Sequence, residues 1–169
     1  MSKKVIFLDF DGVLNSTQTY KQNNGDRLFY GRKSHWSLEL LMKSVVSHYD
    51  FYKIQLLKSI CFSTDAEIVG VSAEVTSKYY PLVDEVFVNM GLPIVDAISS
   101  EYGRANAIQT YLMDHDVERF IVLDDEIFMG YEDFWDFVVK TDFYNEGLTE
   151  ELAEEAVMIL GPKKHINLK

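Results

Sequence analysis

Two aspartates directly follow a short apolar segment near the start of this chain, and they constrain the fold more than any other feature. The segment from Val5 to Leu8 is rich in β-branched and aromatic residues, which predicts a buried strand too short for an ordinary helix. Asp9 and Asp11 come next, and Gly12 lets the backbone turn away after them. Ligands of open α/β sheets bind beyond the carboxyl ends of the strands. The sequence therefore predicts a site built around this carboxylate pair.

The chemistry of such a pair leaves two uses open. Two carboxylates suit a hard cation such as Mg²⁺, and they also suit a carboxylate nucleophile beside a general acid/base. The pattern Asp-x-Asp-Gly also occurs in calcium loops, but an EF-hand loop needs further oxygen ligands and a closing Glu, and Val13 and Leu14 supply none. A plain turn would not explain the buried strand that leads into it. We therefore interpret Asp9 and Asp11 as a catalytic pair.

Apolar strand-like segments alternate with helix-like segments along the rest of the chain. We expect strands at 66–71, 93–98, 119–123 and 137–139, and helices at 36–48, 51–62, 76–90, 105–112 and 149–160. Asp50 is a candidate cap for the second helix, and Ser99 or Ser100 for the fourth. This alternation predicts an α/β fold with a mainly parallel five-stranded sheet and right-handed crossovers. A chain of 169 residues fits one domain, so we expect a single domain over residues 1–169.

Polar side chains follow three of the expected strands. Asp9 and Asp11 follow the first, Ser72 follows the second, and Asp124 and Asp125 follow a later one. Parallel strands place their carboxyl ends at one edge of the sheet. We therefore expect these five residues to meet in one site.

With these strand-end residues, the chain resembles the haloacid dehalogenase (HAD) superfamily of phosphohydrolases. Segment 8–15 (Leu-Asp-Phe-Asp-Gly-Val-Leu-Asn) resembles the first motif of that family, and segment 69–72 resembles the second. Arg104 stands where the family carries a basic residue, and segment 121–125 resembles the fourth motif. The resemblance covers nearly the whole chain and is nearest to small members without a large cap, of the RNA-repair and polynucleotide phosphatase type. It implies a three-layer, Rossmann-like HAD fold and a Mg²⁺-dependent phosphatase that acts on a nucleotide or a nucleic-acid end.

The resemblance also implies a catalytic role for each motif residue. Asp9 would attack phosphorus and form an aspartyl-phosphate, and Asp11 would protonate the leaving group and later deprotonate water. Ser72 would hydrogen-bond a phosphoryl oxygen, and Arg104 would offset the phosphoryl charge, with Lys78 as the alternative cation.

The implied Mg²⁺ ligands are the Asp9 carboxylate, the Asp11 backbone carbonyl and Asp125, while Asp124 supports the site. The chain departs from small family members after Ser72, where Ala-Glu-Val replaces a Ser-Trp-Arg-like continuation. A positive group is therefore missing there.

The polar segment 15–34 leaves directly from the catalytic turn, and we interpret it as a candidate lid within the domain. It carries an unusual excess of basic residues for this chain, of which Arg27 and Arg32 are the candidate substrate contacts. The alternative is a solvated loop whose cations only offset the acidic surface. The histidines show no ligand spacing, and we expect them on the surface or in the core. The aromatic residues from Phe128 to Phe137 are expected in the core and at its rim.

Composition excludes several classes of protein. The formal net charge of −11 argues against extended wrapping of a nucleic acid, although a small anion could still bind at a metal. No segment approaches the ~18 apolar residues of a membrane span. The single cysteine, Cys61, cannot form an internal disulfide, which fits a cytoplasmic protein with a core thiol.

Two other function classes remain alternatives. A catalytically weak or inactive HAD-fold binding module would need neither Asp9 nor Asp11, so the presence of both counts against it. A phosphoacceptor receiver domain also joins clustered acids to an α/β sheet, but its acceptor would lie on a middle strand along the chain. The pair after the first strand disfavours that class.

Overall fold

The computed structural model describes residues 3–22, 43, 48–72 and 80–163, and it contains one five-stranded sheet in the order β3-β2-β1-β4-β5. All four neighbouring pairs are parallel, which confirms the predicted α/β class. The strands are β1 (Lys3–Leu8), β2 (Ala66–Gly70), β3 (Ile94–Ala97), β4 (Val117–Asp124) and β5 (Val138–Lys140). The apolar strand before the aspartate pair is therefore the central strand.

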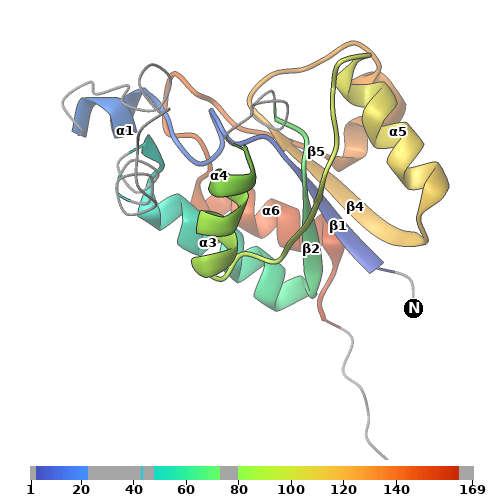
Figure 1. The fold of residues 1–169 in the computed structure, drawn as a ribbon, viewed down its shortest axis with the longest axis horizontal. Helices are drawn as coiled ribbons and strands as arrows, with labels where there is room; N and C mark the ends of the chain where they lie inside the picture. Colours follow the sequence, from blue (N-terminus) through green and yellow to red (C-terminus); the bar gives the residue numbers. More distant parts are fainter. Residues whose placement is uncertain (1–2, 23–42, 44–47, 73–79, 164–169) are drawn as a thin grey trace, which may run out of the picture.

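Helices cover both faces of the sheet (Figure 1). One face carries α3 (Phe51–Thr64), α4 (Tyr80–Asn89) and α6 (Glu150–Leu160). The other carries α5 (Arg104–Asp114) and the 3₁₀ helix η3 (Tyr131–Phe137). The short helix α1 (Thr17–Gln22) follows the turn after β1. None of the helices in the described part of the chain is long and apolar enough to cross a membrane.

Alternation along β1 divides the core into two layers. Ile6 and Leu8 face α3 and α6, whereas Val5 and Phe7 face α5, and all four side chains are buried. A strand that is buried on both faces reads as a continuous apolar run. Full burial of each such side chain contributes about 1.5–3 kcal/mol.

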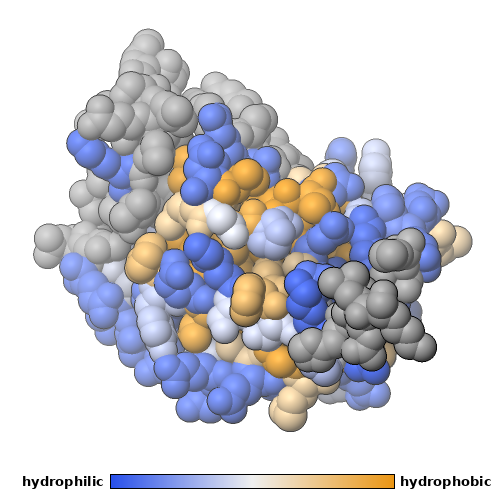
Figure 2. All heavy atoms as spheres, turned by 90° about the horizontal axis from the view of Figure 1, so that it is seen from below, coloured by the Kyte–Doolittle hydropathy of each residue, from blue (hydrophilic) through white to orange (hydrophobic). Residues whose placement is uncertain are grey.

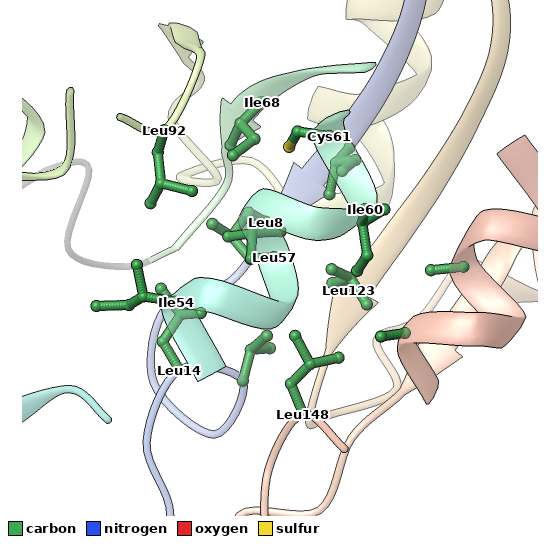
Figure 3. Packing of buried hydrophobic residues seen from close by; sticks show 14 of the residues in the cluster. Leu8, Leu14, Ile54, Leu57, Ile60, Cys61, Ile68, Leu92, Leu123 and Leu148 are labelled. Carbon is green, nitrogen blue, oxygen red and sulfur yellow. The ribbon is translucent and has the colours of Figure 1, made fainter. Parts of the chain in front are cut away.

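The layer between α3 and the sheet is closely packed. In Figure 3, Leu57 and Ile60 of α3 point toward Leu8 and Leu123 of the two central strands. Cys61 lies in the same cluster, as predicted, and burial raises the pKa of its thiol to about 12. Figure 2, seen from below, shows apolar patches bordered by hydrophilic side chains on the outside of the molecule.

The structure tests the predicted caps of two helices, α3 and α5. Asp50 caps α3 as predicted, because its Oδ1 accepts a hydrogen bond of 2.9 Å from the Tyr52 amide. The prediction of a serine cap for α5 is wrong, because this helix begins later, after Gly103 at a φ of +100°. The described part of α4 begins at Tyr80, so the expected start at residue 76 lies outside the described residues, as does almost all of the expected helix at 36–48.

The register brings the strand ends to one level. Leu8 pairs with Gly70 of β2 and with Leu123 of β4, and Asp124 pairs with Lys140 of β5. The residues that follow these positions therefore emerge together at the carboxyl edge of the sheet.

Candidate active site

A buried arginine joins two of the strand-end carboxylates. Arg104, the first residue of α5, places Nη1 2.9 Å from Oδ2 of Asp9 and 2.5 Å from Oδ2 of Asp124. Asp124 is fully buried, and Arg104 and Asp9 are each only 7% exposed. Burial alone would lower the pKa of Arg104, but the two carboxylates raise it overall, so the guanidinium stays protonated and positively charged. The structure thus brings three of the predicted site residues into direct contact.

Asp124 is held from several sides. The Tyr131 hydroxyl donates to its Oδ2 at 2.7 Å, and the Glu126 amide donates to its Oδ1 at 3.0 Å. The Phe128 ring lies 4.3 Å from the Arg104 guanidinium carbon. The aromatic segment is therefore both core and rim, as predicted, but the contacts of Tyr131 and Phe128 to the charged groups were not expected from the sequence.

Asp9 is oriented toward the cleft by its own neighbours. Its Oδ1 accepts a hydrogen bond of 2.9 Å from the Phe10 amide, and the Ser72 hydroxyl also hydrogen-bonds its carboxylate. Burial raises the pKa of Asp9 to about 6, against the lowering effect of Arg104, and Asp124 raises it further. The carboxylate is thus ordered, but its negative charge is only partly compensated.

Three carboxylates form a cluster that could hold a divalent metal. Asp9, Asp124 and Asp125 each offer an oxygen, and these atoms lie within 4.8 Å of one another. Burial and the neighbouring carboxylates raise the pKa of Asp125 to about 6. Oxygen donors of this kind, crowded together with excess negative charge, fit a hard divalent cation. Asp124 is fully buried and accepts hydrogen bonds from Arg104, Tyr131 and the Glu126 amide. Asp9 and Asp125 instead line the cleft, so these two are better placed to bind a cation that enters it.

Gly12 allows this cluster to form. It has a φ of +79°, and a Cβ at this position would lie 2.2 Å from Cγ of Asp125. The turn after β1 therefore passes too close to Asp125 for any side chain.

Asp11 has two polar neighbours that sequence reasoning missed. His48 Nε2 lies 3.1 Å from Oδ1 of Asp11, and Nδ2 of Asn15 donates to the same oxygen at 2.7 Å. His48 is 1% exposed and Asn15 is fully buried. His48 is thus in the core, in agreement with the sequence, but it also contacts the Asp11 carboxylate in the turn after β1. No spacing signal links His48 to Asp11, because 37 residues separate them.

The site opens into a cleft of about 480 Å³. Its lining includes four residues already predicted on strand ends, Asp9, Asp11, Ser72 and Asp125, together with Arg104. The remaining lining residues were not predicted as site residues: Glu126, Lys140, Asp142, Phe143 and Tyr144. Lys140 is the last residue of β5. A search for polar side chains at the carboxyl ends of all the expected strands would therefore have included it.

Several predicted contacts lie outside the described residues. These are the alternative cation Lys78, the departing segment 73–75 and the basic residues Arg27 and Arg32 of the candidate lid. Their roles remain predictions.

Comparison with family models gives a match over residues 5–153, to the HAD domain in Swiss Army Knife RNA repair proteins. The chain belongs to this HAD family. The fold is accordingly HAD-like and Rossmann-like, and the family supports a phosphohydrolase-type enzyme in general. Searches among curated proteins and among solved structures gave no match.

The raised pKa of Asp125 predicts that neutralising this carboxylate stabilises the metal-free protein, by an amount that depends on pH. A carboxyl whose folded-state pKa lies near 6 rather than 3.8 destabilises the fold once it ionises, so the cost grows between pH 4 and 6. At pH 7 in EDTA, Asp125→Asn should raise the melting temperature by about 2–4 °C, the shift that about 1 kcal/mol produces in a chain of this size. The gain is small because Asp125 is partly exposed, so solvent screens its carboxylate.

The gain should shrink as the pH falls toward 4, where Asp125 of the wild type is protonated. Asp136→Asn removes the same charge from an exposed aspartate of η3 and serves as the control. Melting curves that show equal gains for both variants at every pH would contradict the interpretation.

Proposed function

We propose that this chain is a Mg²⁺-dependent phosphatase that hydrolyses a phosphate monoester, at a nucleotide or a nucleic-acid end, through an aspartyl-phosphate. The observation that carries the proposal is the Asp9 carboxylate, which faces the cleft while Arg104 and Ser72 hold it in place. The name of the matched family refers to RNA repair, which favours a phosphorylated nucleic-acid end as the substrate. The whole described chain would act as one catalytic domain.

The first chemical step would form the covalent intermediate. A carboxylate oxygen of Asp9 attacks phosphorus, and the bond between phosphorus and the leaving oxygen breaks. Asp11, which lines the same cleft, donates its proton to that leaving oxygen. Arg104 and Ser72, both in contact with Asp9, offset the charge on the phosphoryl oxygens.

The second step would release phosphate. Asp11 takes a proton from a water molecule, and the water oxygen attacks phosphorus of the aspartyl-phosphate. The bond between phosphorus and Asp9 then breaks, so Asp9 regains its carboxylate. The same residue thus acts first as the acid and then as the base.

Mg²⁺ would be held by the carboxylates of Asp9 and Asp125 and by the backbone carbonyl of Asp11, and it would supply positive charge for the phosphoryl group. The contacts of Asp124 support its assignment to Arg104 rather than to the metal. This division of labour explains why the two adjacent acids have different surroundings, one fully buried and one beside the cleft.

Asp9→Asn tests the nucleophile. The substitution removes the attacking charge with almost no change in shape, so kcat should fall to less than about a tenth of wild type, a loss of at least about 1.4 kcal/mol. Hydrolysis of aryl and nucleotide phosphates measures the effect, with Asp136→Asn, at an exposed aspartate of η3, as the control. Retention of more than a tenth of the activity would rule out the covalent mechanism.

The two adjacent acids should respond differently to substitution. Asp125→Asn should raise the Mg²⁺ concentration for half-maximal activity more than Asp124→Asn does. Asp124→Asn should instead lower the melting temperature, because it weakens a buried ion pair of Arg104. Metal titrations and melting curves of both variants provide the measurements, and activity that survives EDTA would reject the metal requirement.

His48 should act by orienting Asp11. His48→Phe removes a contact at 3.1 Å and keeps a ring of similar size, so protonation of a poor leaving group should suffer. We expect kcat/KM for a nucleoside phosphate to fall about tenfold, or about 1.4 kcal/mol, and kcat/KM for dinitrophenyl phosphate to fall much less.

The choice of substrates gives this experiment its control. Dinitrophenolate leaves without protonation, and kcat/KM reports the steps up to formation of the phospho-enzyme. His48→Gln, which keeps a polar contact, should restore part of the loss. Equal losses on both substrates would show that His48 only supports the fold.

A further inference from the structure

The cleft has a second wall that the catalytic proposal does not use. Lys140, Phe143 and Tyr144 line it together with Asp9 and Asp125. They lie at the end of β5 and in the loop that follows, at the carboxyl edge of the sheet. This wall therefore stands beside the position of the reacting phosphate.

The loop after β5 is fixed to the catalytic turn. The Thr141 hydroxyl donates to the Gly12 carbonyl at 2.8 Å. The Thr17 amide donates to the Phe143 carbonyl at 2.9 Å, and the Thr17 hydroxyl donates to the Tyr144 carbonyl at 2.8 Å. The backbone that carries Phe143 and Tyr144 thus has a defined position relative to the catalytic residues.

The two aromatic residues on this loop have different surroundings. Phe143 is partly buried, and its ring centre lies 5.8 Å from that of Tyr20. Tyr144 is 81% exposed, and its ring meets that of Phe143 edge-on at 5.5 Å. The structure therefore presents a tyrosine ring to solvent from an anchored backbone, which suits stacking against a planar group at a low cost in conformational entropy.

Lys140 supplies a cation at the same wall. Within the part of the chain that the structure describes, it takes part in no ion pair, and its Nζ contacts only the Thr141 carbonyl among the hydrogen bonds found, at 3.2 Å. The other cation of the described lining, Arg104, is buried between Asp9 and Asp124. Of the two cations in the described lining, Lys140 is thus the one that can bind an anion outside the catalytic centre.

We propose that Tyr144 and Lys140 bind the leaving group: Tyr144 stacks on the base of the terminal nucleotide, and Lys140 binds the adjacent phosphodiester. The inference rests on the proposed phosphatase function and narrows its substrate to the phosphorylated end of an oligonucleotide. A free sugar phosphate offers neither a base nor a second phosphate to this wall. Recognition of this kind depends on the backbone and one base, so it agrees with an acidic protein that does not wrap a long nucleic acid.

Kinetics with two substrates test the proposal. The substrates are a four-nucleotide RNA with a terminal phosphate, supplied in separate 3′- and 5′-phosphorylated forms, and 4-nitrophenyl phosphate. Tyr144→Ala should lower kcat/KM for the preferred RNA end about tenfold more than for the aryl phosphate, mainly through KM. Tyr144→Phe keeps the ring and should retain most of the wild-type value.

Lys140→Gln should also lower kcat/KM for the RNA selectively, and it should flatten the dependence of KM on salt. Tyr102→Ala is the matched aromatic control, because Tyr102 is 85% exposed and lines a different cavity. Lys163→Gln is the charge control, because Lys163 pairs with Asp65 just before β2, at the opposite end of that strand from Ser72. Equal losses on both substrates, or no loss on RNA, would overturn the inference.

Binding separates this inference from the catalytic one. Fluorescence anisotropy of the labelled RNA with the Asp9→Asn protein measures affinity without turnover, and Tyr144→Ala in that background should weaken it about tenfold. If RNA binding depends on Tyr144 but the wild-type protein hydrolyses no phosphate ester, the proposed phosphatase activity is wrong and the proposed binding role of Tyr144 stands. If the wild-type protein hydrolyses aryl phosphate but Tyr144→Ala leaves RNA binding unchanged, the phosphatase activity stands and the proposed role of Tyr144 is wrong.

Discussion

The site depends on one buried arginine between two buried carboxylates. Arg104 contacts Asp9 of the central strand and Asp124 of its neighbour, and it thereby ties the start of α5 to two strand ends. Removal of one partner from a buried ion pair costs about 3–5 kcal/mol, because a charge is left without compensation. The three residues are thus both the centre of the proposed chemistry and a junction of the fold. One positive charge cannot neutralise Asp9, Asp124 and Asp125 together, which explains the fit of the site to a cation.

A network of backbone and hydroxyl contacts surrounds this centre. Gly12 passes Asp125 at a distance that excludes a side chain, and its carbonyl accepts a hydrogen bond from Thr141. The turn after β1 is therefore in contact with the segments after both β4 and β5. These contacts fix the positions of the three segments that line the cleft relative to one another. A pre-organised active site requires such fixed positions of its reactive groups.

The charges of the cleft suggest how an acidic protein can act on an anion. Five of its lining residues are acidic, namely Asp9, Asp11, Asp125, Glu126 and Asp142, whereas the described lining offers two cations. A bound divalent metal would invert this balance locally, so that a phosphate could approach Asp9. Lys140 and Tyr144 at the second wall would then select what the phosphate is attached to. Catalysis and selection would thus rest on different strand ends.

The sequence by itself determined the fold class and most of the central site. Val5 to Leu8 is apolar because β1 is buried on both faces, and the strand-end residues Asp9, Ser72 and Asp124 could be placed together because parallel strands share one edge. The motif resemblance also indicated Arg104, and the structure brings it to Asp9.

Only the tertiary structure decided which further side chains reach these residues. His48 contacts Asp11 from another part of the chain, and Tyr131 of η3 donates a hydrogen bond to Asp124. Tyr144 lies at the cleft on a loop whose carbonyl accepts a hydrogen bond from the distant Thr17 hydroxyl. None of these contacts follows a sequence period, because each depends on how separate segments of the chain pack together at the sheet edge. Periodicity reports which face of an element is buried, whereas packing between elements decides which polar groups meet at its end.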